Sequence, residues 1–138
     1  MTKTARDVMT SDPACCTPNT TLDQVAKLMV QNDCGEIPVV DVAERIVGVI
    51  TDRDIAIRAI AEGKDGQTPV REVASQDLVT IDPQQDLDEA LRLMAQHQVR
   101  RLPVVEEDGK LVGIVSQADV ARHGDDARTG EVVEQISE

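Results

Sequence analysis

Apolar residues change their spacing along this chain in a fixed order, and the order occurs twice. In residues 22–29, Leu, Val, Ala and Met recur every three or four positions, as on one face of an amphipathic helix, and residues 87–94 repeat the pattern. Short apolar stretches at residues 14–17 and 78–81 precede these helices and predict strands. Each helix is followed by two β-rich stretches and a second helix. The pattern therefore predicts an α+β fold of two βαββα units.

The two units are copies of one sequence. Residues 5–56 align with residues 70–121 at a constant offset of 65 and without a gap, so that Asp54 falls on Asp119. One such unit has about fifty residues and a single apolar sheet face, which makes it marginal alone. We therefore expect the two sheets to pack together.

The domain boundaries follow from this repeat. We assign residues 5–62 to the first repeat and residues 70–123 to the second. Residues 63–69 are polar and punctuated by Gly and Pro, as in a linker. Residues 124–138 form an acidic tail.

Both first helices carry start signals. Thr21 with Gln24, and Asp86 with Glu89, have the spacing of a capping box, in which the cap and the third helical residue bond each other's backbone amide. We expect the helices to end near Gly35 and Val99.

Charge and composition exclude several classes of partner. The net charge is −12 and the chain has no Phe, Tyr or Trp, so it has neither the basic face nor the stacking rings that nucleic-acid binding needs. No apolar run reaches the roughly 20 residues of a membrane helix, and we expect a cytoplasmic protein that binds neither nucleic acid nor membrane. Any anion must be held by locally placed cations.

The three cysteines, Cys15, Cys16 and Cys34, have no Cys-x-x-Cys spacing, so buried thiols are the simplest interpretation and a redox sensor is the alternative. The two histidines have no metal-ligand spacing with Cys34 or with each other, and no catalytic constellation is suggested. We expect no metal site, no required cofactor and no enzyme activity.

The motifs "EIPVVD", "RIVGVITDRDI" and "QVRRLPVVEEDGKLVGIVSQADV" occur in order, and the chain resembles a tandem pair of CBS domains of the small stand-alone bacterial type. The resemblance covers about residues 5–123. It implies two βαββα repeats related by a pseudo-twofold axis, with clefts that commonly bind AMP, ADP, ATP or S-adenosylmethionine. It also implies a homodimer that acts on a protein target, which the sequence does not identify.

Thr51 with Asp54, and Ser116 with Asp119, fit two roles. A Ser/Thr-x-x-Asp helix start needs no ligand to explain it. The resemblance implies that the aspartate holds a ribose diol while the hydroxyl helps to hold a phosphate. The two roles are compatible.

The resemblance further implies an apolar slot for adenine near four strand residues and two threonines: Ile37, Pro38, Leu102, Pro103, Thr10 and Thr80. Buried core strand is the equal alternative for Ile37 and Leu102. Because proline cannot donate to a ladder, Pro38 and Pro103 predict a strand edge with backbone groups free for a base.

Arg100 and His97 match positions that contact phosphate in some members of the family, whereas their first-repeat counterparts are Gly35 and Asn32. The second repeat is therefore expected to suit an anion better. Weaker phosphate candidates are Arg53, Arg58 and His123, and for every arginine a solvated surface side chain is the alternative. Glu36, the counterpart of Arg101, either repels a phosphate or pairs with an arginine.

The leading hypothesis is a regulatory module that binds an adenosine ligand in clefts between the repeats. The alternative is a non-catalytic scaffold or dimerisation protein with empty clefts. Sequence alone does not choose between them.

Overall fold

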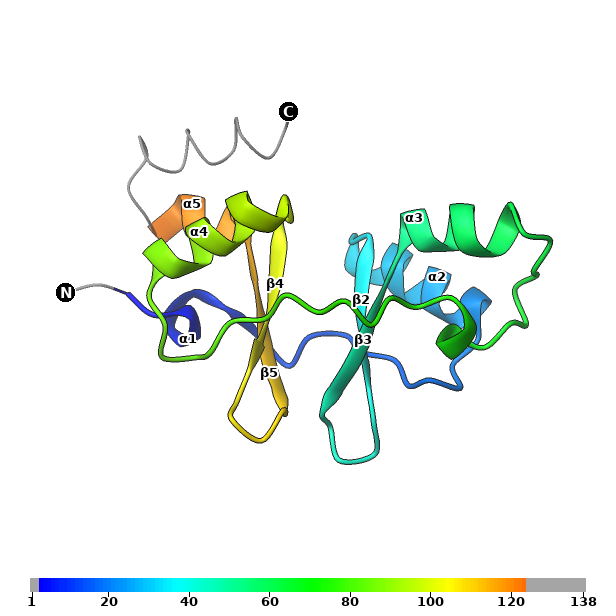
Figure 1. Cartoon of the computed structure of the whole chain (residues 1–138), viewed down its shortest axis with the longest axis horizontal. Helices are drawn as coiled ribbons and strands as arrows, with labels where there is room; N and C mark the ends of the chain where they lie inside the picture. Colours follow the sequence, from blue (N-terminus) through cyan, green and yellow to red (C-terminus); the bar gives the residue numbers. More distant parts are fainter. Residues whose placement is uncertain (1–2, 124–138) are drawn as a thin grey trace. The chain divides into compact units, whose positions relative to one another are not determined.

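The computed structural model describes residues 3–123, which form two compact units (Figure 1). The first is one continuous stretch, Ala14–Leu78, called here the middle unit. The second combines residues up to Pro13 with residues from Val79 onward, and is called here the split unit. Each contains a sheet and helices, so the α+β class predicted from the sequence is confirmed.

The middle unit is built on an antiparallel pair of strands, β2 (Glu36–Val40) and β3 (Ile46–Thr51). Its helices are α2 (Leu22–Asn32), the single turn α3 (Asp52–Asp54), the π-helical η1 (Ile55–Ile60) and the 3₁₀ turn η2 (Val70–Glu72). The core is aliphatic apart from Cys16 and Met29, as the lack of aromatic residues requires.

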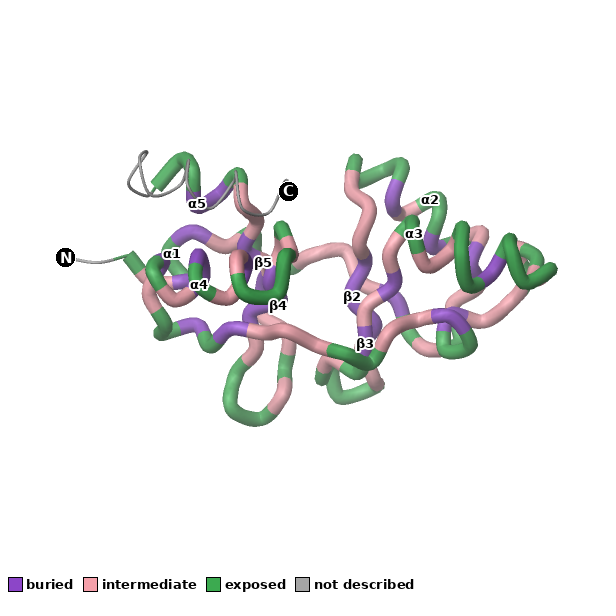
Figure 2. The backbone as a smooth tube through the Cα atoms, turned by 45° about the horizontal axis from the view of Figure 1, so that its top comes forward, coloured by how far each residue is buried: buried purple, intermediate pink, exposed green. Residues whose placement is uncertain are grey.

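The split unit has a three-stranded antiparallel sheet in the order β1-β5-β4, made of β1 (Thr10–Ser11), β5 (Leu111–Ser116) and β4 (Arg101–Val105). Its helices are α1 (Ala5–Val8), α4 (Leu87–His97) and α5 (Gln117–His123). In both units the second residue of the hairpin's first strand is fully buried, and Figure 2 shows buried stretches along these strands.

The first segment of each repeat pairs with the sheet of the other repeat. Thr10 pairs with Ile114 of β5, and its counterpart Ser75 forms an antiparallel bridge with Val49 of β3. Ala5 and Val8 of α1 are buried in the core of the split unit. The compact units and the sequence repeats therefore divide the chain at different places, and each unit contains residues of both repeats.

Residues 14–17 and 78–81 do not form the strands that their composition predicts. Each stretch makes a single parallel bridge, Cys16 to Val39 and Ile81 to Val104. Proline explains the interruption in the middle unit, because proline has no backbone N–H. Pro38 therefore cannot donate to the Ala14 carbonyl on one side of Cys16, and Pro18 cannot donate to the Val40 carbonyl on the other side. The counterparts Pro103 and Pro83 interrupt the ladder of the split unit in the same way.

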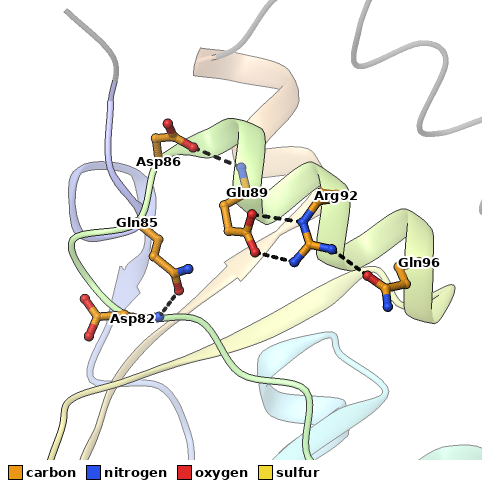
Figure 3. Close-up of polar contacts among 6 residues, drawn as sticks. All are labelled: Asp82, Gln85, Asp86, Glu89, Arg92 and Gln96. Carbon is orange, nitrogen blue, oxygen red and sulfur yellow. Dashed lines mark hydrogen bonds and ion pairs between the residues drawn. The ribbon is translucent and has the colours of Figure 1, made fainter.

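The first helices begin where predicted. Thr21 and Gln24 form the capping box of α2. Asp86 accepts a hydrogen bond of 2.9 Å from the Glu89 amide at the start of α4, but the predicted reciprocal bond is absent because the Glu89 carboxylate is held by Arg92 (Figure 3). The helices end at Asn32 and His97, slightly before the predicted positions, and each is followed by a cap residue with left-handed backbone, Asp33 or Gln98.

Candidate ligand-binding site

The two hydroxyl–aspartate pairs form the same turn in the two units. In the first turn (Thr51–Asp54), the Thr51 amide donates to the Asp54 carboxylate at 3.0 Å and the Asp54 amide donates to the Thr51 hydroxyl at 3.0 Å. In the second turn (Ser116–Asp119), the corresponding distances are 2.9 and 3.1 Å. Both turns are complete capping boxes, so the capping role predicted from the sequence is present in both.

The two aspartates differ in what else they contact. Asp119 is 4% exposed, and its second carboxylate oxygen accepts a hydrogen bond from the guanidinium of Arg122. Asp54 is half-buried, and the residue at the position of Arg122 is Ile57, which is 47% exposed. Among residues 3–123, the Asp54 carboxylate has only the Thr51 amide as a hydrogen-bond partner. One carboxylate is therefore already paired with a cation and the other is not.

The ends of neighbouring strands lie directly beside the turns. Glu36 is the cross-strand partner of Thr51, and Arg101 is the cross-strand partner of Ser116. Directly opposed residues share a face of the sheet, with Cβ atoms roughly 4.5–5.5 Å apart. The first turn therefore has a negatively charged neighbour and the second turn a positively charged one. Sequence reasoning gave Glu36 two alternative roles, repelling a phosphate or pairing with an arginine, and named Arg101 as its counterpart, but it did not place either residue beside a turn.

The strand residues assigned to an adenine slot are deeply buried. Ile37 is 1% exposed and Leu102 is 0% exposed, so both side chains belong to the cores. Pro38 and Pro103 are also buried, and their carbonyls accept hydrogen bonds of 3.0 Å from Cys16 and Ile81. The prediction that backbone groups at these prolines are free is therefore wrong for the carbonyls, because the single parallel bridges use them.

The two threonine candidates lie in the same unit. Thr10 is exposed in β1, which pairs with β5, and Thr80 directly precedes Ile81, which bridges to β4. Both threonines therefore belong to the unit that contains the second turn. Their counterparts in the middle unit are Ser75 and Cys15. Sequence reasoning did not name these counterparts, although the offset of 65 residues gives both of them.

The basic candidates are on the surface. His97 ends α4 and Arg100 lies just before β4; both are exposed. Arg53 is exposed within the first turn. The Arg100 and Arg101 side chains make no hydrogen bond or ion pair with any residue between 3 and 123. Two unpaired guanidinium groups are therefore adjacent in sequence at the second turn.

The cysteines are all thiols. Burial raises the pKa of Cys16 to about 12, and the neighbouring Cys15 adds a smaller effect. Burial also raises the pKa of Cys15, and the negative charge of Glu44 contributes less. These shifts disfavour the reactive thiolate that a redox sensor needs. Within the described residues, no group of three or more His, Cys, Asp or Glu side chains is placed to hold a metal ion. No helix in that part of the chain is long and apolar enough to cross a membrane.

The family model of the CBS domain matches this sequence twice, at residues 5–60 and 70–126. The chain belongs to the CBS domain family. It is 50% identical to the CBS domain-containing protein YhcV of Bacillus subtilis over 116 residues, which is 84% of this chain and 81% of that protein. It is also 36% identical to inosine-5′-monophosphate dehydrogenase of Bifidobacterium longum, but over only 22% of the enzyme.

Solved CBS structures resemble this fold and include ligand complexes. Hypoxic Response Protein I, solved with two coordinated zinc ions, is 40% identical, with a TM-score of 0.81 over 89% of this chain and all of that one. CBSX2, solved in complex with AMP, is 29% identical, with a TM-score of 0.77 over 87% of this chain and 94% of that one. The CBS domain pair of protein MJ0100, solved with 5′-methylthioadenosine and S-adenosyl-L-methionine, is 26% identical, with a TM-score of 0.77 over 87% and 98%.

Proposed function

We propose that this protein is a non-catalytic regulatory module of the cytoplasm that binds an adenosine ligand at its two hydroxyl–aspartate turns. The ligand class is AMP, ADP, ATP or S-adenosylmethionine. The observation that carries the proposal is the repetition of one turn in two units, each with a hydroxyl and a carboxylate held at fixed positions beside a charged strand end. Relatives that bind AMP or S-adenosylmethionine support the ligand class.

The chemistry of the turn suits a nucleoside. A carboxylate has about four acceptor sites, so an aspartate that already caps a helix can still accept two hydrogen bonds from a ribose cis-diol. Thr51 and Ser116 each present a hydroxyl next to that carboxylate. Capping holds the carboxylate still, which lowers the cost of ordering it when a ligand binds.

The test is calorimetric titration of the pure protein with AMP, ATP and S-adenosylmethionine. Because the chain has no Trp or Tyr, it absorbs almost nothing at 280 nm, and a peak near 260 nm reports bound nucleotide directly. We expect micromolar binding, equivalent to about 8 kcal/mol at 1 μM. The absence of heat and of a thermal shift with all three ligands would overturn the proposal.

One observation favours a second function. Both turns satisfy their own hydrogen bonds without a ligand, as expected of a scaffold or dimerisation protein whose sites are empty. Under either function, we propose that the chain forms a homodimer. Val30 on α2 is 81% exposed and Ile60 on η1 is 64% exposed, and aliphatic side chains of this kind on helices are suited to contact with a second copy.

The homodimer has its own test. Light scattering at micromolar concentration is expected to give twice the 15.0 kDa chain mass. Val30→Glu is expected to shift the protein toward monomer. The matched control is Val42→Glu, the same substitution at an exposed valine outside the helices, and it is expected to leave the dimer intact. A monodisperse wild-type monomer would remove this part of the proposal and leave ligand binding untouched.

A further inference from the structure

The two turns are alike in backbone geometry but have opposite charge around them. The Asp52 amide donates to the Gly35 carbonyl at 2.9 Å, and its counterpart Gln117 donates to the Arg100 carbonyl at 2.8 Å. The helix start and the end of the neighbouring strand are therefore joined in the same way in both units. Differences in ligand preference must come from the side chains placed on this common frame.

At the first turn, the frame is mainly acidic. Glu36 is the cross-strand neighbour of Thr51, and Asp52 follows Thr51 directly. The Asp52 carboxylate occupies the space in front of Gly35, because a Cβ built there would lie 2.7 Å from its Oδ2 atom. Together with Asp54, the turn has three carboxylates and a single guanidinium, that of Arg53.

At the second turn, basic residues take the corresponding positions. Arg101 replaces Glu36 beside the hydroxyl, Arg100 replaces Gly35, and the uncharged Gln117 replaces Asp52. Arg122 neutralises Asp119, where the first turn has Ile57. This turn has three guanidinium groups and one carboxylate. Arg58, four residues after Asp54, has the counterpart His123, which is neutral in the formal charge at pH 7, so that position lowers the contrast by one charge without reversing it.

We infer that the two turns select adenosine ligands of opposite charge. The second turn takes the phosphorylated, anionic ligand, and the first turn takes an adenosine that carries a positive charge or none, such as S-adenosylmethionine. This inference rests on the proposed function and extends it by naming the class of ligand for each site.

Local charge decides this selection because the chain as a whole opposes anions. With a net charge of −12, the long-range field repels a nucleotide phosphate. A phosphate therefore needs short-range, charge-assisted hydrogen bonds, which guanidinium groups supply in forked geometry. Arg100 and Arg101 have no ion-pair partner among residues 3–123, so neither must break an ion pair seen there to contact a phosphate.

The experiment combines two ligands with charge reversal at the paired positions. AMP and S-adenosylmethionine are titrated into the full chain, and the aspartate of each turn is changed separately, as Asp54→Asn and Asp119→Asn. We expect Asp119→Asn to weaken AMP alone and Asp54→Asn to weaken S-adenosylmethionine alone. Arg101→Glu is expected to weaken AMP by about 10- to 100-fold, the value of a lost charged hydrogen bond, and to leave S-adenosylmethionine within about twofold.

The matched control is Lys110→Glu, which changes the net charge by the same amount at the opposite end of the β4–β5 hairpin. It is expected to leave both affinities within about twofold, and Arg101→Gln is a milder variant should Arg101→Glu lower the melting temperature. If both ligands bind but depend equally on both aspartates, or if Lys110→Glu weakens AMP as much as Arg101→Glu, the charge inference fails and the adenosine-binding function stands. If neither ligand binds the wild-type chain, the proposed function itself fails.

Discussion

Gly48 lies in β3 of the middle unit, beside the segment of the second repeat that contains Ser75. A Cβ built on Gly48 would lie 2.8 Å from the carbonyl oxygen of Ser75. That carbonyl accepts a hydrogen bond of 2.9 Å from the Val49 amide, and the Ser75 amide returns one of 2.9 Å to the Val49 carbonyl. Gly48→Ala therefore requires the backbone around Ser75 to move.

The cost follows from the two hydrogen bonds and the overlap. Each backbone bond contributes about 0.5–1.5 kcal/mol, and forcing an extra carbon into a packed position costs about 1–3 kcal/mol. The sum is about 2–6 kcal/mol of the free energy of unfolding. For a chain of this size, that corresponds to a fall in melting temperature of roughly 8–24 °C.

Thermal melting followed by circular dichroism measures the change, and hydrogen exchange of the Val49 and Ser75 amides localises it. Val47→Ala, at a 39% exposed position of the same strand, is the control and is expected to cost less than about 1 kcal/mol. A Gly48→Ala protein that melts within about 2 °C of wild type, with both amides still protected, would refute the close approach of the Ser75 carbonyl to Gly48.

Three further outcomes follow from the same structure. In urea titrations, Asp119→Asn is expected to lower the free energy of unfolding by roughly 0.5–1 kcal/mol more than Asp54→Asn, because only Asp119 loses an ion pair. The difference stays small because the Arg122 side chain is exposed to water, and equal costs would contradict this reasoning. Leu102→Ala is expected to cost about 2–5 kcal/mol, since Leu102 is 0% exposed, and a loss below about 1 kcal/mol would place it outside the core. Because folding raises the pKa of Cys16 to about 12, the stability linked to this thiol is complete below about pH 9 and is lost as the pH rises toward 12. Cys16→Ala is expected to flatten the decline of the melting temperature with pH in this alkaline range, and an unchanged slope would contradict the prediction.

Periodicity and the offset of 65 residues predicted most elements, because helices and hairpins are formed by residues close in sequence. The helices starting at Leu22 and Leu87 and the two hairpins lie where their patterns placed them. The strands predicted at residues 14–17 and 78–81 were wrong, although the reason was in the sequence: prolines at the paired positions interrupt both ladders.

The charge environment of the turns could be predicted only in part. The alignment pairs Glu36 with Arg101, but only the strand register shows that each lies beside the hydroxyl of its turn. The pairing of Thr10 with Ile114 depends on the approach of distant segments, which no local pattern encodes. The ion pair at Asp119 is different, because Arg122 lies three residues later on the same helix, and opposite charges at this spacing can be found in the sequence.

The crossing of the first segments has a consequence for synthesis on the ribosome. Ala5 and Val8 are core residues of the split unit, and β1 pairs with β5, which lies near the end of the described chain. At roughly 5–20 residues per second, this amphipathic beginning waits for about 5–20 s before its partner strand is made. The middle unit, whose residues follow one another without interruption, can be complete by then. Translation order therefore favours folding of the middle unit first, and residues 5–11, although made before it, are among the last to pack against their partners.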